Sequence, residues 1–145
     1  MLVRCLYASH AAGRITAATV DSILEQSRRN NAEAGITGML CFTDDIFIQV
    51  IEGGRDAVCE LFNTLVRDER HTGVRLLRFE EITERTFGSW TMGKVDFSRT
   101  SQTLLLKYFD TARLDPFAAP GGATLSLLTE LIRSGTINGR GKAGE

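Results

Sequence analysis

The stretch GITGMLCFTDDIFIQVIEGG, which runs from Gly35 to Gly54, decides the fold of this chain. Residues 39–42 and 46–51 are apolar runs separated by the turn-forming pair Asp44-Asp45, a pattern that predicts a β-hairpin. Side chains alternate between the two faces of a strand, and both faces of residues 46–51 carry apolar side chains. Such a strand is typical of the middle of a sheet that is covered on both sides.

Gln49 is the exception to this apolar pattern. It lies at the centre of the second strand, on the face that carries Phe47 and Ile51. A buried amide without hydrogen-bond partners costs about 1–3 kcal/mol. We therefore expect polar groups around Gln49, and their identity is the key to the function.

Composition limits the classes of protein that this chain can be. With 145 residues it is one domain, or one domain with a short extension, and its net charge of -1 favours neither a nucleic acid nor a membrane surface as partner. No apolar run approaches the roughly 20 residues that span a bilayer, and no signal peptide is recognisable. The three cysteines, Cys5, Cys41 and Cys59, fall in apolar segments, which predicts reduced core thiols in a cytoplasmic protein; metal-ligand spacing is absent.

The order of the predicted elements indicates an α+β fold. Strands are expected at residues 2–9, 73–81 and 90–95 in addition to the hairpin, and helices at residues 16–29 and 55–67. The order β-α-β-β-α-β-β predicts a ferredoxin-like sheet with one added strand and two helices on one face. In this topology the first and third strands are neighbours, so Tyr7 should lie beside Gln49.

Two asparagines follow the first predicted helix. If the helix runs on, Asn30 and Asn31 continue the inward stripe that Val20 and Leu24 begin. Together with Tyr7 and Gln49 they would form an uncharged polar set in an otherwise apolar cavity. This set contains no general base, no activated nucleophile and no metal ligand set. Its amide and phenol groups suit a planar heterocycle with alternating C=O and N–H groups, of which the pyrimidine edge of a flavin is one.

The composition changes after Ser98. Short helices are predicted at residues 103–108 and 123–133, and we expect them to cover the second face of the sheet. The Gly-rich tail, residues 135–145, is predicted to be disordered. The expected division is a core domain (1–98), a helical extension (99–134) and a tail (135–145).

Each candidate residue also has an ordinary structural explanation. A tyrosine in a strand is usually a core residue, and Asn-Asn after a helix is usually a C-cap. In the same way Trp90 suits packing, Met92 suits gap filling, and Arg70-His71 suits a solvated loop. The functional interpretation depends on the convergence of these residues on one cavity.

Six motifs lie between about Leu2 and Asp96: LYAS (6–9), NN (30–31), GITGML (35–40), FIQVIEG (47–53), DERH (68–71) and WTMG (90–93). Through them the chain resembles BLUF domains, which are blue-light sensors that use FAD. The resemblance implies a flavin-binding sensor, not an enzyme, of the short stand-alone type, with FAD as the cofactor and FMN as the alternative. It also implies a downstream protein partner, and we expect a homo-oligomer.

The resemblance also implies roles for single residues. Asn31, with Asn30 beside it, would hold the C4=O and N3–H edge of the flavin. Tyr7 would give an electron and a proton to the excited flavin. Gln49 would then rearrange its amide and cause a red shift of the absorption.

The remaining motif residues are implied to lie around this centre. Arg70 and His71 match a loop near the phosphates of the cofactor. Trp90 and Met92 lie beside Gln49 and would relay its change to the last strand and the C-terminal helices. Whether Trp90 or Met92 stands next to the flavin before illumination stays open.

Three other functions fit a ferredoxin-like fold. An acylphosphatase-type hydrolase would need a phosphate-binding loop, and the segment 11–13 is too short and lacks clustered glycines. A flavin-dependent oxidoreductase would need access for a second substrate, and a reaction with NADPH under air would reveal it. A ligand-free interaction module would be colourless after purification.

Overall fold

The computed structural model describes residues 1–134, and the predicted disordered tail lies outside them. The elements in chain order are β1 (Leu2–Ala11), α1 (Ala17–Ala34), β2 (Thr37–Phe42), β3 (Ile46–Gly54), α2 (Arg55–Val66), β4 (His71–Ile82), β5 (Gly93–Asp96), a 3₁₀ turn (Phe97–Arg99), α3 (Gln102–Tyr108) and α4 (Gly121–Arg133).

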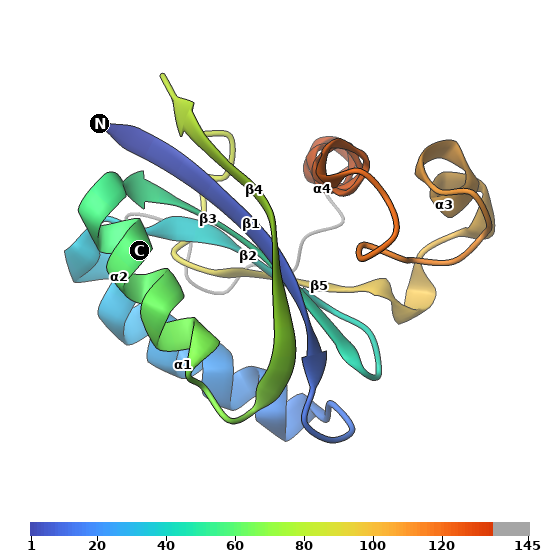
Figure 1. Ribbon diagram of the computed structural model, residues 1–145, viewed down its shortest axis with the longest axis horizontal. Helices are drawn as coiled ribbons and strands as arrows, with labels where there is room; N and C mark the ends of the chain where they lie inside the picture. The colour runs from blue at the N-terminus through green and yellow to red at the C-terminus, as the bar shows by residue number, and fades with distance from the viewer. Residues whose placement is uncertain (135–145) are drawn as a thin grey trace.

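In the described part of the chain the strands form one sheet in the order β4-β1-β3-β2-β5. β1 pairs antiparallel with both β3 and β4, while β5 joins β2 in parallel. The first four strands and the helices α1 and α2 thus give the expected ferredoxin-like arrangement with one added strand (Figure 1). The hairpin of β2 and β3 is confirmed, and β1 and β3 are central neighbours as predicted.

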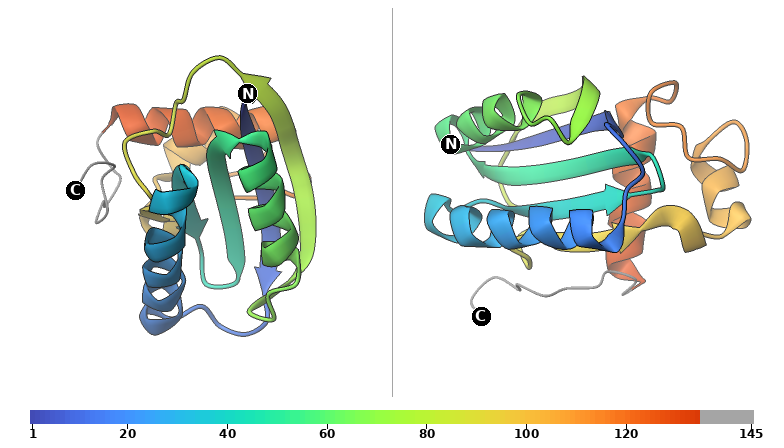
Figure 2. Two further views of the ribbon diagram at one scale, coloured as in Figure 1. Left: turned by 90° about the vertical axis from the view of Figure 1, so that its left-hand side faces the viewer. Right: turned by 90° about the horizontal axis from the view of Figure 1, so that it is seen from below.

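Each face of the sheet is covered by helices. Figure 2 shows α1 and α2 on one face and α4 across the other, as expected for the C-terminal helices. The alternation along β3 divides its side chains between the two layers: Phe47 and Ile51 pack beneath α1 and α2, while Ile48 and Val50 pack against α4. Complete burial of such a side chain contributes about 1.5–3 kcal/mol, so both layers stabilise the sheet and share its central strand.

The length of α1 determines where the asparagines lie. Thr16 caps the first turn, where its side chain accepts a hydrogen bond from the Thr19 amide at 3.2 Å. The helix ends at Ala34 and is capped by Gly35, whose φ of 69° is the left-handed conformation that glycine adopts without strain. The predicted end at Arg29 was therefore five residues too early, and the longer helix carries both asparagines in its last turns.

Three further details differ from the sequence expectations. The last strand begins at Gly93, since residues 90–92 form the end of a loop that contacts β2 through one bond, from the Gly38 amide to the Trp90 carbonyl at 3.1 Å. Cys59 is exposed on α2, so only Cys5 and Cys41 are core thiols. His71 opens β4 and is buried, which the solvated-loop explanation did not foresee.

No helix among residues 1–134 has the length and apolar character needed to cross a bilayer.

Candidate functional site

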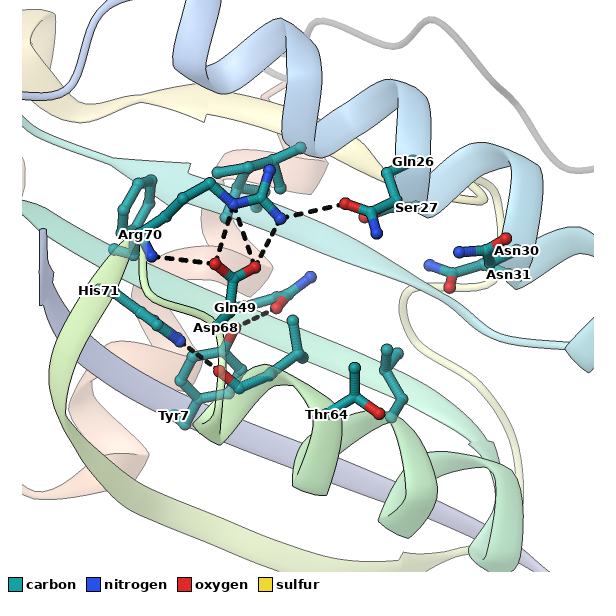
Figure 3. A pocket seen from close by; sticks show the side chains of 15 residues that line it. Tyr7, Gln26, Ser27, Asn30, Asn31, Gln49, Thr64, Asp68, Arg70 and His71 are labelled. Atoms are coloured by element: carbon teal, nitrogen blue, oxygen red, sulfur yellow. Dashed lines mark hydrogen bonds and ion pairs between the residues drawn. The ribbon is translucent and has the colours of Figure 1, made fainter. Parts of the chain in front are cut away.

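A cavity lies between α1 and α2 above the central strands, and it is lined by all four residues of the predicted polar set (Figure 3). The walls come from β1, β2, β3, both helices and the loop that joins α2 to β4. The side chains that line it are Tyr7, Ile23, Gln26, Ser27, Asn30, Asn31, Leu40, Phe47, Gln49, Leu61, Thr64, Leu65, Asp68, Arg70 and His71.

Tyr7 and Gln49 form the floor of this cavity. They are paired in the register of β1 and β3, and each is only 2% exposed. The Tyr7 hydroxyl donates a hydrogen bond to Gln49 Oε1. The amide Nε2 of Gln49 in turn donates to Met92 Sδ at 3.5 Å. The amide therefore has a partner at each end, but the thioether is only a weak acceptor.

Burial controls the acidity of Tyr7. Removal from water raises the pKa of the phenol far above its usual value near 10. The ring also packs edge-on against Phe62 with centroids 5.8 Å apart. The phenol consequently keeps its proton at physiological pH.

The two asparagines occupy different places. Asn31 is 2% exposed and donates from Nδ2 to the Thr91 carbonyl at 3.3 Å. Asn30 lines the cavity but is exposed, so the expectation that both side chains point inward holds fully only for Asn31. Consecutive helical residues are about 100° apart, which explains why only one of the two can point directly at the sheet.

Arg70 links the loop after α2 to helix α1. Its guanidinium contacts the Asp68 carboxylate at 2.5 to 3.0 Å and donates to Gln26 Oε1 at 3.1 Å. The hydrogen-bonded arginine lowers the pKa of Asp68, which keeps this carboxyl ionised. The Arg70 guanidinium and the Asp68 carboxylate thus form an ion pair in a cavity whose other polar groups are mostly neutral.

His71 has both ring nitrogens engaged by protein groups. Nδ1 bonds with Ser9 Oγ at 2.7 Å, and Nε2 with the Leu65 carbonyl. Because a carbonyl only accepts, Nε2 donates to it, while Nδ1 shares its hydrogen bond with a serine hydroxyl that can donate or accept. His71 therefore supports the cavity wall between β1 and α2, and Arg70 is the better placed of the two for an anionic group.

Of the two candidate relay residues, Met92 is the one that forms a side-chain hydrogen bond with Gln49. It is completely buried, whereas Trp90 is partly exposed and is held through its backbone. Residues 90–92 also bind α1 through two bonds: Asn31 contacts Thr91, and Arg28 donates to the Met92 carbonyl at 3.2 Å. This loop end thus touches the floor of the cavity and one of its walls.

Comparison with known sequences decides the family. The model of the family "BLUF: Sensors of blue-light using FAD" matches residues 2–93. The chain belongs to the BLUF family. BLUF domains sense blue light with a flavin, and the matched residues are those of a sensor and not of an enzyme.

Relatives of this BLUF domain include multidomain and short proteins. Photoactivated adenylate cyclase subunit beta of Euglena gracilis is 33% identical over 92 residues, which are 63% of this chain but 11% of that protein. The structure titled "BlrB - a BLUF protein, dark state structure" has a TM-score of 0.71 at 32% identity, and covers 92% of this chain and 96% of that one. The structure titled "BlsA photo-activated state" has a TM-score of 0.80 at 28% identity, with 91% and 95% covered.

The residues of the cavity fit the edge of a flavin. Asn31 of α1 and Gln49 of β3 both line the cavity, and their amides can supply both donors and acceptors to a ring with C=O and N–H groups. None of the three cysteines is a cavity residue, and burial raises the pKa of Cys5 to about 12 and that of Cys41 still further. Protonated thiols are poor nucleophiles, so the site suits a flavin that is bound without a covalent bond.

Sequence reasoning missed several functional neighbours. Gln26 lies three residues after Ile23 and four before Asn30, so its helical spacing could have placed it in the cavity. Asp68 could also have been predicted to lie at the cavity, because a carboxylate two residues before Arg70 can pair with its guanidinium across a turn. Arg4 and Glu52 are single charges in apolar strands, and their pairing follows from the register of β1 and β3.

Proposed function

We propose that this chain is a blue-light photoreceptor whose response starts at Tyr7 and Gln49 and is passed to a protein partner. The observation that carries the proposal is the buried hydrogen-bonded series Tyr7 Oη, Gln49 Oε1, Gln49 Nε2 and Met92 Sδ on the cavity floor. An amide at the centre of such a series can reverse its donor and acceptor ends without any change in composition.

A flavin bound in the cavity would absorb blue light and accept an electron. Tyr7 would supply that electron together with its phenolic proton, because a phenol that loses an electron becomes strongly acidic and Gln49 Oε1 is in place to accept its proton. The electron and a proton would both end on the flavin, since the amide that gains the Tyr7 proton at Oε1 would release one of its own N–H protons in exchange and stay neutral. When electron and proton return to Tyr7, Gln49 is left as the rotated or tautomerised amide.

Reversal of Gln49 changes its contact with Met92. In the structure the amide N–H of Gln49 donates to the Met92 sulfur. In the rotated amide an oxygen would face the sulfur, and two acceptors cannot form a hydrogen bond. Met92 therefore loses its partner at the cavity floor, which favours a movement of residues 90–92.

Four residues are proposed to hold the cofactor apart from Tyr7 and Gln49. Asn31 and Asn30 serve the pyrimidine edge, and Arg70, with its guanidinium in the cavity, serves an anionic or carbonyl group. His71 acts mainly by supporting the wall. We assign FAD as the cofactor and keep FMN as the alternative.

The output is proposed to leave through the last strand and the C-terminal helices. α3 and α4 share a hydrophobic core with the central strands, so a movement at residues 90–92 has a packed layer to act on. The receiver is a downstream protein or a second copy of this chain in a homo-oligomer, in the cytoplasm, and neither a nucleic acid nor a membrane.

Release of the chromophore from purified protein tests this assignment. The protein should be yellow, and acid or heat should release a free flavin that chromatography identifies as FAD. Absence of flavin after reconstitution would contradict the proposal. Rapid consumption of NADPH under air would favour the oxidoreductase alternative instead.

A further inference from the structure

Glu52, at the end of β3, is a completely buried carboxylate. Its Oε2 accepts hydrogen bonds from Arg4 Nε at 2.7 Å and from the Thr86 amide at 3.2 Å. Its Oε1 accepts from the Phe87 amide at 2.5 Å. The carboxylate therefore fixes two successive backbone amides of the loop between β4 and β5.

Arg4 completes this anchor. Besides Glu52 it binds Glu80 through Nη1 at 2.7 Å and the Thr86 hydroxyl through Nη2 at 2.8 Å. Its guanidinium also lies 5.8 Å from the centre of the Phe87 ring. A buried ion pair whose hydrogen bonds are satisfied holds its position, because separating the two side chains would leave an unpaired charge buried away from water.

The same loop reaches the cavity at its other end. Met92 receives the hydrogen bond of Gln49, and the carbonyls of residues 90–92 bind β2 and α1. Only five positions separate Phe87 from Met92. One end of a short segment thus touches the cavity floor, and the other is pinned by Glu52.

Phe87 belongs to the opposite face of the sheet. It is completely buried in the hydrophobic cluster that contains Leu127, Leu128 and Leu131 of α4. The β4–β5 loop consequently connects the cavity on one face with the helix on the other.

We propose that the Arg4–Glu52 pair is the pivot of the β4–β5 loop, and that Glu52 is a positioning residue which makes α4 respond to Gln49 through Phe87. The inference rests on the proposed function and adds to it the path by which a change at Gln49 reaches α4. Glu52 holds the amides of Thr86 and Phe87 in place. A displacement that starts at Met92 therefore rotates residues 87–92 about these two amides. The ring of Phe87 then shifts within the α4 cluster.

Nuclear magnetic resonance of the 16.0 kDa protein tests this route. In the flavin-loaded wild type, the Thr86 and Phe87 amides should exchange slowly in the dark and in the light, while the resonances of Met92, Phe87 and α4 shift on illumination. Glu52→Gln keeps the side-chain volume but replaces an acceptor oxygen with a donor. It should retain the red shift, speed exchange of these two amides by about tenfold or more, and abolish the light-induced shifts in α4.

Glu80→Gln is the matched control, since Glu80 binds Arg4 but none of the loop amides. It should leave the red shift, the slow exchange and the α4 response in place. If Glu52→Gln does not fold, Phe87→Leu provides the second test: it keeps both anchored amides, and it should retain the red shift but show no light-induced shifts in α4.

An α4 response that persists in either Glu52→Gln or Phe87→Leu would overturn the inference. The inference would also be overturned if illumination of the wild type caused the red shift and shifted the Met92 resonances but left those of Phe87 and α4 unchanged. A wild type with flavin but without any red shift would instead contradict the proposed function, and this inference with it.

Discussion

Alkaline pH should destabilise this protein through its two buried thiols. Burial raises the pKa of Cys5 from 9.0 to about 12 and raises that of Cys41 further, while both titrate near 9.0 in the unfolded chain. Since the folded-state pKa is the higher one, the contribution to stability is fully present below pH 9 and is lost as pH rises toward the folded values. The unfolded state releases protons that the folded state retains.

The size of the loss follows from the linkage relation. At pH 10 each thiol lowers the free energy of unfolding by roughly 1–2 kcal/mol relative to pH 7, and the two together by about 3 kcal/mol. Tyr7, whose pKa is also raised by burial, adds to the loss above pH 10. A chain of this length is expected to have a total stability of roughly 7–20 kcal/mol, so the loss is readily measurable.

Urea unfolding at pH 7 and pH 10, under reducing conditions and with saturating flavin, measures this difference. A Cys5→Ala/Cys41→Ala variant should lose about 3 kcal/mol less than the wild type over the same interval. Cys59→Ala, which changes the exposed cysteine, should behave as the wild type does. An equal loss in the double variant and the wild type would refute the reasoning about buried thiols.

The remaining predictions concern the cavity and the helical layer. Asn31→Ala should weaken flavin binding by about tenfold, since it removes hydrogen bonds to the ring; fluorescence titration of the apoprotein measures this, and unchanged affinity would exclude the assigned contact. At neutral pH Arg70→Ala should weaken binding more than Arg70→Lys does, because lysine retains the positive charge, and the difference should shrink as pH rises toward the lysine pKa of about 10.4; equal affinities at neutral pH would count against a charge contact. Leu128→Ala should destabilise the protein by about 2–5 kcal/mol, because this side chain of α4 is completely buried between the helix and the sheet; a loss below 1 kcal/mol in thermal unfolding would show that α4 contributes little.

The strand pairing at the site was predictable because hydrophobic alternation and topology determine it together. The apolar run around Gln49 required a central strand, and a ferredoxin-like order places the strand of Tyr7 beside it. Asn31 was predictable by helical period once the helix continued to Ala34. The position of Asn30 was less predictable, because consecutive residues of a helix point about 100° apart and cannot both face the sheet directly.

Other features depend on tertiary contacts that no local pattern contains. Cys59 lies in an apolar stretch of α2 but faces solvent, since only one side of that helix meets the sheet. The start of the last strand was misplaced because side chains of α1 and β3 bind residues 91 and 92. The anchor at Glu52 joins positions 4, 52, 86 and 87, so its contacts became visible only in three dimensions.

The light-minus-dark absorption spectrum tests the central claim most directly, if it is recorded for the wild type, Tyr7→Phe and Gln49→Ala at equal flavin occupancy. The account predicts a small reversible red shift in the wild type and none in either variant, because one lacks the proton donor and the other the reversible amide. A normal red shift in Tyr7→Phe or Gln49→Ala, or a large blue shift typical of a cysteinyl adduct in the wild type, would contradict it.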